Sequence, residues 1–170
     1  WENNPPFYAA ANRARQAFAV YWNNGGHGMS GEAPADVKAW SDAIYRYRLD
    51  TSYLAFSECS DDRRYGHGDP ADGDLVGWIN RGLGWSGLED SAEVYAVTVT
   101  ADYPGVTYPV SVAVTPRRRQ SFRPPPGAVL LAQVGAEAPQ AVTVEPSGLF
   151  TVPAVRIADA AGARLVIRRR

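Results

Sequence analysis

The stretch AEVYAVTVTADYPGVTYPVSVAVT, residues 92–115, carries the most informative pattern for the fold. Its two arms, residues 92–100 and 106–115, alternate apolar and polar side chains with a period of two, which is typical of half-buried β-strands. The DYPG sequence between the arms predicts a turn, and Pro109 predicts an edge strand or a bulge. One face of the second arm is shared by Val106, Tyr108, Val110, Val112 and Val114.

Short strand-like segments continue to the end of the chain. Short apolar segments (AVLLAQV, AVTVE, LFTV, AVRI and ARLVIR) follow one another, separated by proline and glycine. About seven short strands at such intervals predict a β-sandwich over residues 92–170.

The first 56 residues have a different character. PPFYAAANRARQA (5–17) favours a helix, AFAVYW (17–22) favours a short buried strand, and APADVKAWSDAIYRYRL (33–49) favours a second helix. Residues 23–28 interrupt this order with a loop rich in glycine and asparagine. Residues 1–56 are therefore predicted to be an α/β fragment.

Residues 57–91 link these two parts. They are dense in Asp, Gly, Ser and Asn, so we expect an ordered loop with little regular structure. The predicted organisation is thus an α/β fragment (1–56), a connecting loop (57–91) and an all-β sandwich (92–170).

The composition sets limits on function. The chain has 170 residues, 45% of them hydrophobic, and a formal net charge of −1, so neither a nucleic acid nor a charged membrane surface is an expected partner. No apolar run approaches the roughly 20 residues of a membrane span. Cys59 is the sole cysteine, which excludes an internal disulfide. The chain opens on WENNPPFY without a methionine, so we expect a mature or fragmentary polypeptide.

The loop after the first predicted strand holds the candidate catalytic residue. In YWNNGGHG (21–28), His27 follows the strand and precedes the second helix, and glycines leave room around its ring. Catalytic groups in open α/β sheets lie on loops beyond the carboxyl ends of strands, and an imidazole there can act as a general base. The alternative is a loop histidine without a catalytic role.

The order helix, AFAVYWNNGGHG, helix resembles the end of an α/β-hydrolase domain, and a terminal sandwich ending in GLFTVPAVRI is similar to large bacterial hydrolases of the prolyl-oligopeptidase-like or esterase-like type. The resemblance implies that His27 is the triad histidine of a serine hydrolase acting on a small-molecule, peptide or polymer ester substrate. It also favours a secreted or periplasmic location over a cytoplasmic one. This chain has no G-x-S-x-G elbow, so the nucleophile and the acid are expected from a missing N-terminal part, and the chain alone is expected to be inactive.

An acidic run in the connecting segment is the candidate metal site. HGDPADGD places Asp69, Asp72 and Asp74 within six residues, and carboxylates at such spacing can wrap Ca²⁺. The same residues are also common in ordinary turns, where their side chains bond backbone N–H groups. His67 is interpreted as a solvated loop residue, because one histidine among acids is not a zinc site.

The aromatic residues support a second class of function. Trp78 and Trp85 follow the acidic run, and exposed tryptophans can stack on sugar rings. The alternative function is therefore a non-catalytic accessory β-sandwich module that binds carbohydrate or calcium. Burial of these tryptophans between two parts of the chain is the competing interpretation.

Overall fold

The structure, a computed structural model, describes residues 4–22, 33–44, 48–63 and 76–170 and is nearly all β in this part of the chain. It contains two short helices, α1 (Asn4–Arg13) and α2 (Ala35–Ile44). The strands are β1 (Val20–Trp22), β2 (Tyr53–Ser57), β3 (Gly77–Ile79), β4 (Leu83–Asp90), β5 (Val94–Ala101), β6 (Val110–Arg117), β7 (Val129–Val134), β8 (Gln140–Thr143), β9 (Val152–Ile157) and β10 (Ala163–Arg169). Neither helix is long and apolar enough to cross a membrane.

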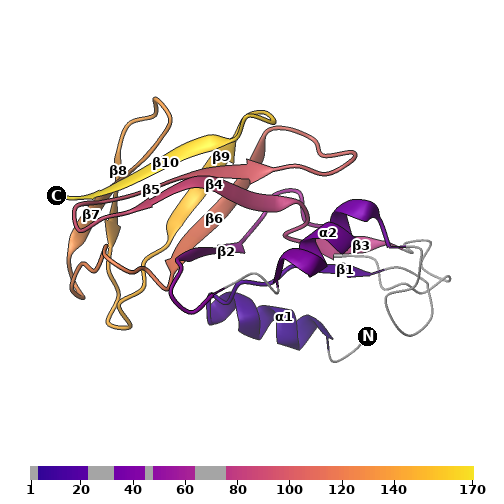
Figure 1. Cartoon of the computed structure of the whole chain (residues 1–170), viewed down its shortest axis with the longest axis horizontal. Coiled ribbons are helices and arrows are strands. Elements are labelled where there is room, and N and C mark those ends of the chain that lie inside the picture. Colours follow the sequence, from indigo (N-terminus) through magenta and orange to yellow (C-terminus); the bar gives the residue numbers. More distant parts are fainter. Residues whose placement is uncertain (1–3, 23–32, 45–47, 64–75) are drawn as a thin grey trace.

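Two antiparallel sheets form a β-sandwich (Figure 1). One has five strands in the order β4-β5-β10-β7-β8, and the other has three in the order β2-β6-β9. At the other end of the molecule from the C-terminus lie α2, β1 and β3 (Figure 1). The β-sandwich predicted from the alternating pattern is confirmed, and two of its strands, β2 and β4, come from residues before 92.

The expected α/β fragment ahead of the sandwich is wrong. An α/β domain needs parallel strands with helical crossovers, but β1 has three residues and pairs antiparallel with β3. Residues 53–57, at the end of the expected fragment, form β2 and pair with β6 inside the sandwich. The helical pattern was read correctly in α1 and α2, but these helices flank antiparallel sheets.

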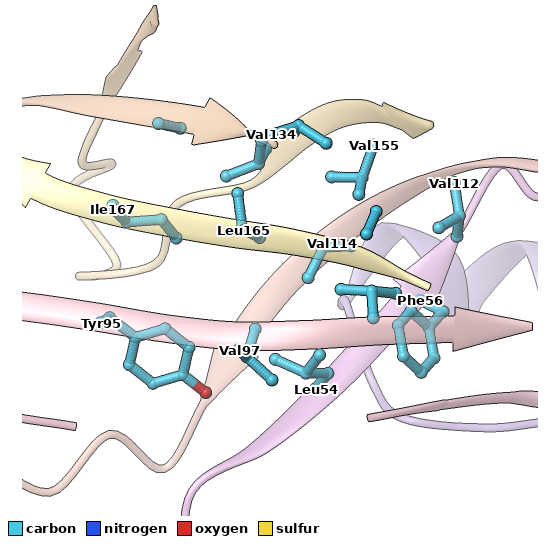
Figure 2. Packing of buried hydrophobic residues seen from close by; sticks show 14 of the residues in the cluster. Leu54, Phe56, Tyr95, Val97, Val112, Val114, Val134, Val155, Leu165 and Ile167 are labelled. Carbon is cyan, nitrogen blue, oxygen red and sulfur yellow. The ribbon is translucent and has the colours of Figure 1, made fainter. Parts of the chain in front are cut away.

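The core between the two large sheets is almost entirely apolar (Figure 2). On β5 and β10 every second residue points inward, and Val97, Leu165 and Ile167 are fully buried. Tyr95 is also fully buried, and its hydroxyl makes a 2.8 Å hydrogen bond with Ser52 Oγ. Burial raises the pKa of Tyr95 to about 12, because the charged phenolate would lose its hydration.

The two arms of the opening stretch do not pair with each other. β5 lies in the five-stranded sheet, and β6 lies in the three-stranded sheet between β2 and β9. The segment between them, which includes DYPG, therefore crosses from one sheet to the other. Pro109 precedes β6 by one residue, and β6 lies between β2 and β9, so the expectation of an edge strand there is wrong.

Two bulges interrupt the alternation along the strands. In β9 both Pro153 and Ala154 are exposed, Ala154 has φ 52°, and the pairing with β6 shifts between Val112 and Val114. In β4 the register shifts after Ser86, where Gly87 has φ 58°. Because the extra residue in a bulge reverses which face the next side chain takes, a strict period of two fails at both places.

The third sheet, made of the two strands β1 and β3, depends on a close contact between an indole ring and a glycine. Trp22 pairs with Gly77, and a Cβ atom added to Gly77 would overlap the Trp22 ring. The Tyr8 ring stacks on Trp22 with the ring centroids 6.3 Å apart, which joins α1 to this sheet. We call residues 4–22 and 33–44, which carry α1, β1 and α2, the N-terminal segment.

Candidate functional site

The residues assigned to chemistry from the sequence lie outside the described part of the chain. These are His27, the proposed general base, and Asp69, Asp72 and Asp74, the proposed calcium ligands. The structure therefore leaves both assignments as predictions. Within the residues that it does describe, no group of three or more His, Cys, Asp or Glu side chains could hold a metal ion.

The two aspartates before the acidic run have structural roles. The Tyr103 hydroxyl donates a hydrogen bond to Asp61, and the Trp78 indole N–H donates to the Asp61 carbonyl oxygen at 2.8 Å. Asp62 Oδ1 accepts the backbone N–H of Asn80 at 2.7 Å. Burial and the hydrogen bond to Asp61 raise the pKa of Tyr103, so it stays protonated as the donor.

Arg81 lies among aromatic rings at the junction between the N-terminal segment and the sandwich. Its guanidinium carbon is 5.3 Å from the ring centre of Tyr21, 5.1 Å from that of Trp78 and 4.6 Å from that of Tyr103. It also donates two hydrogen bonds, of 2.9 and 3.0 Å, to the carboxylate of Asp36 at the start of α2. Through these contacts Arg81 fastens α2.

Asn80 is a second fastening point. Its side-chain amide donates hydrogen bonds to the carbonyl oxygens of Phe18, at 3.0 Å, and Phe56, at 3.1 Å. The residue is 2% exposed and has φ 56°, a left-handed conformation that asparagine tolerates better than most residues. Asn80 thus ties the N-terminal segment to the edge of β2.

The two cavities beside these fastening points are too small for a ligand. One of about 20 Å³ is lined in part by Asp36, Trp40 and Arg81, and one of about 30 Å³ by Trp40, Asn80 and Trp85. Each has room for about one water-sized molecule. Trp85 also packs against Phe56 of the core, and Trp78 lies against the Arg81 guanidinium. The tryptophans proposed from the sequence as sugar platforms are therefore engaged in packing.

A much larger groove lies where α1 meets the outer face of the three-stranded sheet. Its volume is about 560 Å³, within the range of small-molecule sites. The sheet supplies a floor of small side chains, and the end of α1 supplies a polar wall. The lining residues are Asn12, Arg13, Arg15, Ser57, Glu58, Ala113, Thr151 and Pro153.

Strand geometry explains why small residues form this floor. Leu54 and Phe56 of β2 point into the core, so Ser57 points to the outer face, and Ala113 of β6 does so between the core residues Val112 and Val114. Pro153, in the bulge of β9, is exposed and lies at the rim. The floor therefore combines hydroxyl groups with space for a ligand.

Ion pairing holds the wall of the groove in place. Arg15 forms an ion pair with Glu145, in the connection between β8 and β9, and Arg117 Nη1 donates to the carbonyl oxygen of Ala14 at 3.3 Å. Both contacts fix the end of α1 over the sheet. Arg13, in the last turn of α1, is exposed and makes no hydrogen bond or ion pair with the described residues.

Asn12 carries an unsatisfied polar atom beside the groove. Its Oδ1 is shielded from solvent and has no hydrogen-bond partner among the described residues. Such an atom costs about 1–3 kcal/mol.

Sequence reasoning missed the groove. Its residues come from α1, β2, β6 and the start of β9, and no local motif links positions so far apart. The available signal was the pair of arginines at the end of a helix, Arg13 and Arg15, but helix ends attract basic residues for their own stability.

Comparisons with known proteins return nothing: no family model, curated protein or solved structure matches the chain. The resemblance to the α/β-hydrolases is wrong, because the chain is mostly antiparallel β and no hydrolase family model matches it. A general-base role for His27 therefore has no family support.

Proposed function

We propose that the chain is a non-catalytic β-sandwich module that binds a carbohydrate in the groove between α1 and the β2-β6-β9 sheet. The observation that carries this proposal is the groove itself, about 560 Å³ in volume, which is the right size for a short saccharide.

The chemistry of the groove suits a ligand rich in hydroxyl groups. Its wall offers guanidinium donors and the Asn12 amide, and its floor offers the hydroxyls of Ser57 and Thr151. The Thr151 hydroxyl shares a 2.8 Å hydrogen bond with that of the buried Thr115, in which either group can be the donor. Donors and acceptors therefore face a ligand from two sides, as paired recognition of sugar hydroxyls requires.

The floor of the groove is built on rigid elements, and an ion pair positions its wall. Its floor is formed by strands whose opposite face is fully buried core, and its wall is pinned by the Arg15–Glu145 ion pair. A preformed site loses little conformational entropy when it binds.

The test uses the full chain, a neutral saccharide and an acidic one: trigalacturonate and its fully methyl-esterified form. Binding of either should shift the amide NMR signals of Ala113 and Thr151. Ser57→Phe fills the floor of the groove and should weaken binding at least tenfold. The matched control is Thr143→Phe, on the exposed face of β8 in the other sheet, which should bind as the parent does.

Two results would refute the proposal: no shift at the groove with either trimer, or equal loss of binding in the two phenylalanine variants.

A further inference from the structure

We infer that the groove selects an acidic saccharide, with Arg13 pairing to a carboxylate of the ligand and Glu58 opposing it. This inference rests on the proposed function and specifies its ligand. It starts from Arg13 in the groove wall, which makes no hydrogen bond or ion pair with the described residues.

Four carbonyl oxygens at the end of α1 are already hydrogen-bonded without the Arg13 side chain. A basic residue in the last turn of a helix normally bonds the free carbonyl oxygens or offsets their negative potential. Here the carbonyl oxygens are taken by other donors: Ala10 by the N–H of Ala14, Ala11 by that of Gln16, Asn12 by that of Arg15, and Ala14 by the Arg117 side chain.

The neighbouring cation is also committed. Arg15 has its counter-ion in Glu145, with both side chains partly exposed. Arg13 lines the same groove as Arg15 but, unlike Arg15, has no hydrogen-bond or ion-pair partner among the described residues. A guanidinium is a planar fork of donors that matches the geometry of a carboxylate.

The acid in the groove determines how the ligand lies. Glu58, just after β2, is exposed, has φ 55° and lines the groove from the sheet side. A carboxylated sugar avoids Glu58 and turns its charge toward α1. Arg13 thus attracts the ligand carboxylate and Glu58 repels it, so substituting them should change the affinity in opposite directions. Loss of folding could not produce both results.

The experiment compares trigalacturonate with its methyl ester, two trimers that differ only in charge, by calorimetry on the full chain. The parent should bind the acid about fivefold more tightly than the ester at low salt, and the preference should shrink as salt is added. Arg13→Gln should remove the preference, and Glu58→Gln should increase affinity for the acid about twofold. Arg168→Ala, at an exposed arginine on β10, is the control and should change neither.

The outcomes separate this inference from the function on which it rests. Equal binding of acid and ester at the groove overturns the acidic preference and leaves the carbohydrate module standing. Absence of binding by both trimers overturns both. A hexaglutamate peptide that binds at the groove when neither trimer does would replace the saccharide with an acidic peptide and overturn the inference as well.

Discussion

The two large sheets are held together by a packed core of apolar side chains, whereas the N-terminal segment is attached by a few polar and aromatic contacts. In the sandwich, residues such as Leu165 and Ile167 are fully buried among neighbours from both sheets. In the N-terminal segment, attachment depends on a few contacts such as those of Asn80, the Asp36–Arg81 pair and the Arg15–Glu145 pair. Burial spread over many residues gives cooperative unfolding, while a few directional contacts allow local opening.

The largest expected loss of stability comes from truncating a side chain in the core of the sandwich. Leu165→Ala removes a fully buried side chain between β5 and β7 and should cost about 2–5 kcal/mol of unfolding free energy. Urea denaturation should show one transition at a lower midpoint, with loss of both sheets together. Val166→Ala, a neighbour on the outer face, is the control and should shift the midpoint far less.

An intermediate effect is expected at Asn80. Asn80→Gly keeps the left-handed backbone accessible but leaves the carbonyl oxygens of Phe18 and Phe56 without the amide donor. The expected cost is about 1–3 kcal/mol. Hydrogen exchange should accelerate in β1 and α1 more than in β10. Equal acceleration throughout the chain would show that the two regions are not distinct in stability.

The smallest effect, and the most local, is expected at Asp36. Its hydrogen bonds from Arg81 hold the pKa of the Asp36 carboxyl below its usual value, so the pair stabilises the fold above about pH 4. This contribution is lost as the pH falls through the lowered pKa, because the carboxylate that accepts these bonds is then protonated. Asp36→Asn should cost about 1 kcal/mol or less at neutral pH.

Exchange protection of α2 provides the measurement. It should fall in acid for the parent chain and should be low and insensitive to pH in Asp36→Asn. Asp42→Asn, on the same helix, should behave as the parent does, and a global loss of protection in Asp36→Asn would contradict the local attachment.

The alternation in residues 92–115 predicted the strands because inward and outward side chains differ in polarity there, and the same rule held along β10. It did not reveal β4, whose sequence LGWSGLED is rich in glycine because a bulge at Gly87 needs a positive φ. It also missed that β5 and β6 enter different sheets, since polarity reports burial and not pairing partners. The sandwich was therefore predictable, and its strand order was not.

The candidate site was less accessible to sequence reasoning. A histidine among glycines suggested a reactive loop, but that interpretation depended on a parallel sheet which the pairing of β1 with β3 contradicts. The groove is created when Arg13, Ser57 and Thr151 meet through the fold. Their side chains are ordinary for a helix end, a strand end and the residue before a strand, so local sequence did not mark them.

The contact between Trp22 and Gly77 means that the N-terminal segment is held by close steric packing as well as by a charged pair. The packing of the Trp22 ring against Gly77 involves no charged group, so neither pH nor ionic strength should weaken it. Acid or concentrated salt that releases α2 should therefore leave β1 paired with β3. The N-terminal segment would then detach in two stages, with α2 released before the β1-β3 pair separates.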